Sequence, residues 1–210
     1  MPCAKPDRAV AGGHSPMTAR VGLVILPALF VASVTLADTI NSAYTTLDFD
    51  ADCRVTDAPA EGEPGGWVRL VCEGYQGLPV HVVEDDLRMA IAYGGRPAPA
   101  RWQDFFRGFS DVHDMIEWRV HADNGLTPFA TIDRWFVDTR RQTAEGITGA
   151  TQEVLVLSTV ARRPGAVSCV IGYVDAGRNP DANELARAVV GAHAVDFRCN
   201  EDEPRWFESQ

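Results

Sequence analysis

Four cysteines constrain most strongly what this 210-residue chain can fold into. Cys53, Cys72, Cys169 and Cys199 lie far apart, and the fifth cysteine, Cys3, is close to the N-terminus. An even number of cysteines in an exported chain indicates disulfides, and four cysteines allow three pairings. We expect the pairs closest in sequence, Cys53 with Cys72 and Cys169 with Cys199. A zinc site is the alternative, but structural zinc ligands usually come in pairs about two to four residues apart, so we expect no metal.

An apolar stretch near the N-terminus indicates whether the chain is exported to a compartment where these thiols are oxidised. Residues 21–37, VGLVILPALFVASVTLA, carry no charge, follow Arg20 and end in small residues that a signal peptidase recognises. The stretch is shorter than the about 20 apolar residues of a spanning helix, and Pro27 interrupts it. We therefore predict a leader and signal peptide over 1–37, cleaved after Ala37, and a secreted or periplasmic protein with no stable membrane anchor after cleavage. An uncleaved anchor is the alternative.

The charge of the remaining chain limits its partners. Loss of 1–37 removes one acidic and three basic residues and takes the formal net charge from −10 to −12; the charge after cleavage is the same whether translation starts at Met1 or Met17. A negative field disfavours nucleic acid and favours a basic protein or a cationic ligand. The only lysine, Lys5, lies in the leader, so the predicted mature chain has neither a Schiff-base nor a P-loop lysine.

Alternation of apolar and polar residues predicts a series of strands in one domain, 38–200, before a charged tail, 201–210. Residues 38–66 read as loop because DAPAEGEPGG breaks regular structure. The clearest hairpin is QEVLVLSTVA (152–161) and AVSCVIGYV (166–174) around Pro164-Gly165, a type II turn, with both faces covered. The other predicted strands are 67–75 and 80–83, which form a hairpin, then 88–93, 115–121 and 129–137.

Two helices are expected beside these strands. Trp102, Phe105, Phe106 and Phe109 recur at i, i+3, i+4 and i+7, which predicts a short helix with an aromatic face packed on the sheet. The fold class is therefore α+β: a mainly antiparallel sheet with this helix, a C-terminal helix and two disulfides.

The C-terminal helix is predicted to begin at Asp181, where Glu184 three residues later completes a capping box. Leu185, Ala188, Val189 and Ala192 should line its packed face, and a short strand should follow at 195–197. In the charged, loose tail we expect Trp206 and Phe207 to dock on the body, with exposure to a partner as the alternative.

The densest polar segment is DVHDMIEWRVHADNG (111–125). Its strand places Ile116, Trp118 and Val120 on one side and three polar side chains on the other, Glu117, Arg119 and His121. Glu117 and His121 are the weak candidates for catalysis and Arg119 for binding an anion. We favour a solvated strand face with a cross-strand ion pair, because Arg119 would repel a metal ion.

The other motifs do not predict a metal site, a catalytic site or a nucleotide-binding site. Asp48, Asp50 and Asp52 have the rhythm of a calcium loop, but Cys53 and Pro59 replace its glycine and glutamate, which leaves only a looser calcium site as an alternative. The chain contains no G-x-S-x-G, G-x-G-x-x-G or P-loop motif, so we expect no cofactor.

These observations favour an exported periplasmic binding or interaction protein that is not an enzyme. One alternative is a hydrolase of the cell envelope that uses carboxylates, Glu117 with His121. Another is a purely structural envelope protein.

Overall fold

A computed structural model describes residues 39–86, 88–95, 106, 108–122, 126–163 and 165–209. The chain divides into two units, Met1–Leu36 and Ala37–Gln210, and all described residues lie in the second. The predicted signal peptide therefore lies outside them. No helix within the described ranges has the length and apolar character needed to cross a membrane.

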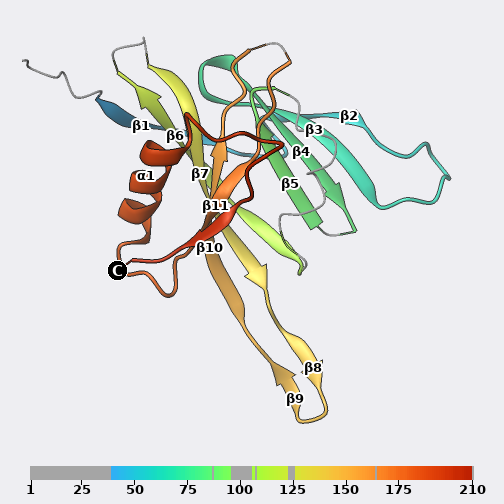
Figure 1. The fold of residues 1–210 in the computed structure, drawn as a ribbon. Coiled ribbons are helices and arrows are strands. Elements are labelled where there is room, and N and C mark those ends of the chain that lie inside the picture. The colour runs from blue at the N-terminus through green and yellow to red at the C-terminus, as the bar shows by residue number, and fades with distance from the viewer. Residues whose placement is uncertain are drawn as a thin grey trace, which may run out of the picture. The chain divides into compact units, whose positions relative to one another are not determined.

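Two β-sheets form most of the fold (Figure 1). The larger has the strand order β1-β6-β7-β10-β11-β12 and the smaller β2-β3-β4-β5; every neighbouring pair is antiparallel except β11 and β12. The strands of the larger sheet are β1 (Ile40–Thr46), β6 (Ser110–His121), β7 (Thr127–Asp138), β10 (Thr151–Thr159), β11 (Val170–Asp175) and β12 (Arg205–Phe207). Those of the smaller sheet are β2 (Cys53–Asp57), β3 (Trp67–Glu73), β4 (Pro79–Asp85) and β5 (Arg88–Tyr93), with the 3-10 helix η1 (Tyr75–Gly77) between β3 and β4. A hairpin of β8 (Arg141–Thr143) and β9 (Gly146–Thr148) extends β7 and β10 beyond the larger sheet (Figure 1).

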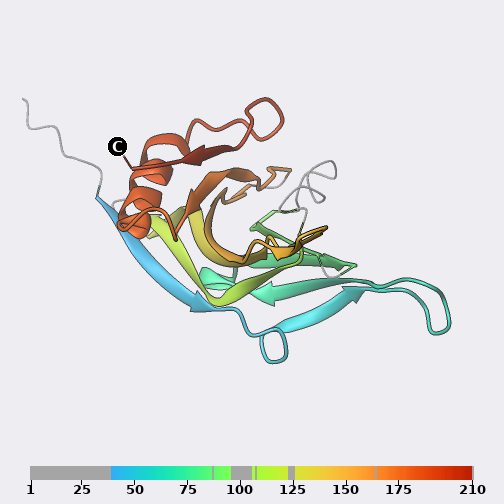
Figure 2. The same cartoon turned by 90° about the horizontal axis from the view of Figure 1, so that it is seen from below.

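The main core lies between the two sheets, and the chain runs directly from β1 in one sheet to β2 in the other (Figure 2). The inward residues of β6 are Ile116, Trp118 and Val120, as the alternation predicts, and all three are buried. From the smaller sheet Val82 and Tyr93 enter the same core. Period-two alternation therefore determines which side of β6 is apolar.

A single α-helix in the described residues, α1 (Ala182–His193), covers the other face of the larger sheet. Val189 and Val190 of α1 join Leu155 and Leu157 of β10 in a second core. Because Val154 and Val156 of β10 enter the first core, both faces of this strand are buried, as its continuous apolar run predicts.

Both predicted disulfides are present. Cys53–Cys72 joins β2 to β3, and Cys169–Cys199 joins the start of β11 to the segment after α1. The mainly antiparallel sheets, the C-terminal helix and the hairpins β3–β4 and β10–β11 are likewise confirmed. In the turn before β11, Gly165 has φ = 80°, as position i+2 of a type II turn requires, while Pro164 lies outside the described residues.

The prediction of loop over 38–66 is wrong, because β1 and β2 lie there. Among the described strands, the β1 segment INSAYTT is an edge strand that pairs with β6 alone. It is partly exposed, so it lacks the apolar alternation of a strand with a buried face. The stretch 58–66 is irregular as expected.

The region of the predicted aromatic helix is mostly outside the description, including Trp102 and Phe105. Phe106 packs between Trp135 and Tyr173, with ring centroids 5.8 and 5.7 Å away. Phe109 is 51% exposed and precedes β6 without helical structure. The described residues therefore do not confirm this helix.

The end of the chain departs from prediction in three details. Asp181 precedes α1, but its side chain makes no capping hydrogen bond. Ala188 and Ala192 are exposed, while Ala182 and Ala186 are buried, because the packed face is centred on Val189 and Val190 together. Residues 195–197 form no strand; instead the tail forms β12, where Phe207 packs on the second core and Trp206 remains 52% exposed.

Candidate functional site

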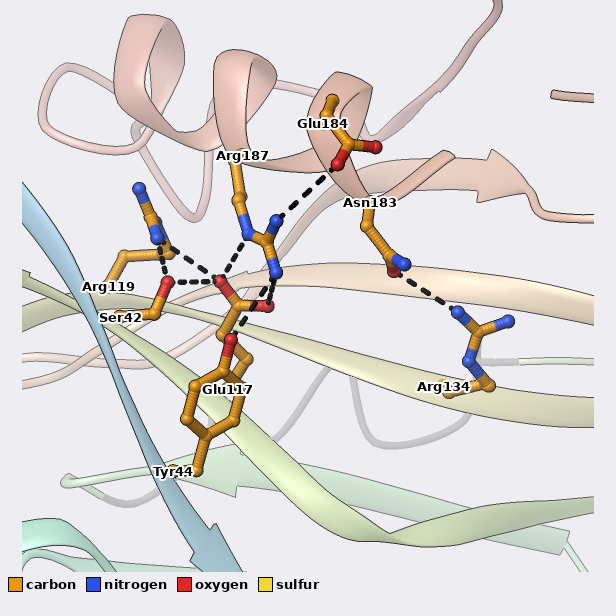
Figure 3. A network of polar contacts seen from close by, with 8 residues as sticks. All are labelled: Ser42, Tyr44, Glu117, Arg119, Arg134, Asn183, Glu184 and Arg187. Carbon is orange, nitrogen blue, oxygen red and sulfur yellow. Dashed lines mark hydrogen bonds and ion pairs between the residues drawn. The ribbon is translucent and has the colours of Figure 1, made fainter. Parts of the chain in front are cut away.

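The outward face of β6 meets α1 through an ion network, drawn in Figure 3. Glu117 is only 8% exposed. Its Oε1 accepts hydrogen bonds from Ser42 Oγ at 2.6 Å and Arg187 Nε at 2.8 Å, and its Oε2 accepts one from Arg187 Nη2 at 3.0 Å. Ser42 lies on β1 and Arg187 on α1, so this carboxylate connects two strands to the helix.

A second guanidinium completes the network. Arg119, also 8% exposed, donates from Nη1 to Glu117 Oε1 at 3.1 Å and to the Ser42 hydroxyl. The Nη2 of Arg187 also donates to the Tyr44 hydroxyl at 3.3 Å. We call the set Ser42, Tyr44, Glu117, Arg119 and Arg187 the Glu117 network.

The network holds Glu117 in its ionised form. Burial by itself would raise the pKa of this carboxyl, but hydrogen bonds from Arg187 and Ser42, and the charges of Arg187 and Arg119, outweigh it and lower the pKa below 4.5. The hydrogen bond to Glu117 in turn raises the pKa of the Arg187 guanidinium. A carboxylate held in this way is a poor proton donor near neutral pH.

His121 lies at the end of the same strand and packs against an aromatic ring. The centroids of His121 and Phe129 are 4.2 Å apart. The structure thus brings Glu117 and Arg119 into contact and gives His121 an aromatic neighbour. Sequence reasoning missed Arg187, whose only local signal is its position three residues after Glu184 on the helix.

The other acidic motif forms a turn. Asp48 Oδ1 accepts hydrogen bonds from the backbone N–H groups of Asp50 and Ala51, at 2.9 and 3.1 Å. This is the local geometry that aspartate favours between strands. Within the described residues, no group of three or more His, Cys, Asp or Glu side chains is arranged to hold a metal ion.

A second buried carboxylate, Asp133 on β7, was not predicted. It is 1% exposed, and its Oδ2 accepts a hydrogen bond of 2.5 Å from the Tyr93 hydroxyl of the smaller sheet. Burial raises the pKa of Asp133 to about 7, although the hydroxyls of Tyr93 and Thr131 act in the opposite direction. The signal in the sequence was the alternation itself, because Asp133 shares the inward side of β7 with Trp135.

An acidic hollow of about 530 Å³ lies between the end of α1 and β12. Its apolar lining consists of Ile171, Ala192, Phe197 and Phe207. Its polar lining consists of His193, Asp196, Glu201, Asp202, Glu203 and Arg205. Arg198 forms ion pairs with Glu201 and with Asp202, the latter at 2.9 Å. Carboxylates therefore exceed guanidinium groups in the lining of this hollow.

The fold and these sites define a disulfide-linked, mainly antiparallel β protein with one described α-helix across its larger sheet. No protein-family model, curated protein or solved structure matches the chain. The arguments for its function therefore rest on its own residues.

Proposed function

We propose that this chain is an exported binding protein of the periplasm that recognises a basic protein or another cationic ligand, and that it is not an enzyme. The two disulfides support an oxidising compartment, since such bonds are rare in the cytosol. The formal net charge of −10 for the whole chain supports a cationic partner.

The acidic hollow is the observation that carries this proposal. Its lining includes the rings of Phe197 and Phe207 and four carboxylates, Asp196, Glu201, Asp202 and Glu203. The apolar groups accommodate the alkyl part of an arginine or lysine side chain, while the carboxylates attract its charged end. The Arg205 guanidinium already lies 5.5 Å from the centre of the Phe207 ring, so a cation and an aromatic ring meet in this hollow.

Binding of an arginine- and lysine-rich peptide to the purified protein, measured by fluorescence anisotropy, tests this proposal. We expect saturable binding that weakens as salt is added. The double substitution Asp196→Asn with Glu203→Gln should weaken binding at least tenfold. The control Asp114→Asn with Glu145→Gln removes the same charge on other exposed surfaces and should have a much smaller effect.

Three outcomes would count against the proposal. Equal losses in both double variants would mean that net charge attracts the peptide without a site at the hollow. Absence of any saturable binding would favour a structural role in the envelope. Turnover of peptidoglycan fragments that disappears in Glu117→Gln would favour the carboxylate hydrolase.

A further inference from the structure

The polar contact between Asp133 and Tyr93 joins the two sheets inside the main core. Tyr93 is 1% exposed and belongs to the edge strand β5 of the smaller sheet, while Asp133 belongs to β7 of the larger sheet. Their hydrogen bond is surrounded by apolar groups: Tyr93 packs edge-on against Trp118 with centroids 5.6 Å apart. Within this core, a carboxyl group thus bridges the two layers.

The surroundings of Asp133 do not support a negative charge. Its neighbours across the strands are Ile116 on β6 and Val156 on β10. Its Oδ1 has no hydrogen-bond partner among the described residues. A buried ionised carboxylate is costly unless it is paired and hydrogen-bonded, so the neutral acid is the form that fits this core.

The titratable groups around Asp133 do not reverse the effect of its burial, although the hydrogen bond from Tyr93 lowers its pKa. Tyr93 is the titratable group that faces it from β5, and burial and then Asp133 itself raise the pKa of that hydroxyl well above 10, so it remains a neutral donor. From β6, the negative charge of Glu117 disfavours ionisation of Asp133. From β10, Val156 and Ser158 carry no charge. No cation among the described residues contributes to the electrostatic environment of Asp133.

We propose that Asp133 is a proton-binding site that makes the packing of the two sheets pH-sensitive: the protonated acid holds them together, and its ionisation weakens their contact. The proton is taken up from solvent on folding at mildly acidic pH and released on unfolding. The Tyr93 hydroxyl donates to the carboxyl group in both forms, so ionisation does not break this hydrogen bond. Instead, the uncompensated negative charge of the carboxylate weakens the contact between the sheets.

The direction of the effect follows from proton linkage. The folded-state pKa of Asp133, about 7, lies above the ordinary value of 3.8. The folded state therefore binds the proton more tightly, and this contribution to stability is complete below 3.8 and is lost as pH rises through 7. Between pH 5 and 8 the unfolding equilibrium constant should rise by roughly a hundredfold from this group alone.

Chemical unfolding of the purified protein and of Asp133→Asn, at a series of pH values from 5 to 8, tests the proposal. The variant keeps the size and an acceptor oxygen but cannot ionise, so the ratio of the two unfolding constants should change by roughly a hundredfold across this range. The control Glu145→Gln removes an exposed carboxylate and should leave the ratio to wild type nearly constant. Parallel pH profiles for wild type and Asp133→Asn would overturn the proposal.

A second measurement needs no substitution. The side-chain carboxyl carbon of Asp133, followed by NMR in the folded wild-type protein, should titrate near pH 7, well above the exposed aspartates. Titration below pH 5 would overturn the proposal even if Asp133→Asn did not fold.

Discussion

Glu117 and Asp133 are buried carboxylates on neighbouring strands of one sheet, yet their protonation equilibria shift in opposite directions. Glu117 faces α1 and receives hydrogen bonds from two guanidinium groups and a hydroxyl. Asp133 faces the core between the sheets, where the hydroxyls of Tyr93 and Thr131 are the described hydrogen-bonding groups that lower its pKa. The difference shows that burial raises the pKa of a carboxyl group only where the fold provides too few donors and no cation.

The two residues therefore contribute opposite slopes to the pH dependence of stability. The pKa of Glu117 is lowered from 4.5, so its contribution is present above that value and is lost as pH falls below it. The pKa of Asp133 is raised from 3.8 to about 7, so its contribution, on the order of 4 kcal/mol, is lost as pH rises to 7. We expect the protein to be most stable at weakly acidic pH.

Removal of Arg187 should have the largest effect on this comparison. Among the described residues, Arg187→Met leaves the buried Glu117 with one cationic partner, Arg119, so its environment becomes more like that of Asp133. We expect the free energy of unfolding at pH 7 to fall by about 3 kcal/mol, the lower end for breaking a buried pair, because 34% of the Arg187 side chain is accessible. Urea denaturation measures this loss.

Two further variants make this prediction specific. Arg178→Met removes an ion pair with Asp175 in which 79% of the arginine side chain is accessible, and should cost little. Adding Glu117→Gln to Arg187→Met should lower the stability further, because the buried Arg119 then loses the carboxylate with which it forms an ion pair at 3.1 Å. If the double variant were as stable as Arg187→Met, the charge argument would be wrong.

Removal of the Tyr93 hydroxyl should have the next largest effect. Tyr93→Phe takes away the hydrogen bond to Asp133 and should cost about 2 kcal/mol at pH 8, where the carboxylate is ionised. At pH 5 the cost should be smaller, because the bond is then made to a neutral acid. Urea denaturation at both pH values measures this difference in cost. In the control Tyr75→Phe, the lost hydroxyl accepts an exposed hydrogen bond from Gln76, and the cost should be the same at both pH values.

Removal of the Ser42 hydroxyl should cost less, because both guanidinium groups remain. Ser42→Ala deletes the 2.6 Å hydrogen bond to Glu117, and we expect a loss of about 1 kcal/mol at pH 7. Ser209→Ala is a matched control, because Ser209 donates to the neutral amide oxygen of Asn179 at 3.0 Å. Urea denaturation measures the loss in the free energy of unfolding for both variants. A smaller loss in Ser42→Ala than in Ser209→Ala would contradict the argument that the charge of Glu117 strengthens its hydrogen bonds.

The sequence predicted the disulfides and the central strands because their signals are local. Cysteine number and spacing favoured Cys53–Cys72 and Cys169–Cys199, and period-two alternation identified the inward side of β6. Strand β1 was missed because its residues are half-exposed and polar, and its structure depends on pairing with β6, far away in sequence. Strand β12 depends in the same way on β11.

The contacts of the two carboxylates could be predicted only in part. Alternation placed Glu117 and Arg119 on one side of a strand, but the approach of Arg187 depends on how α1 crosses the sheet. Asp133 could have been assigned to the inward side of β7 from the position of Trp135. Its hydrogen bond to Tyr93, 40 residues away in the other sheet, is a tertiary contact that no local pattern encodes.

The smallest effect is expected for Glu184, the exposed carboxylate next to the same Arg187. Its Oε1 lies 3.8 Å from Arg187 Nη1, and 71% of its side chain is accessible. Solvent screens such a pair, so Glu184→Gln should reduce the free energy of unfolding by only about 0.3 kcal/mol, a loss that disappears at high salt. Arg187 thus has one buried and one exposed acidic partner, and urea denaturation of Glu184→Gln beside Arg187→Met separates their contributions. A loss in Glu184→Gln as large as that in Arg187→Met would mean that the helix-surface pair, and not the buried carboxylate, holds α1 on the sheet.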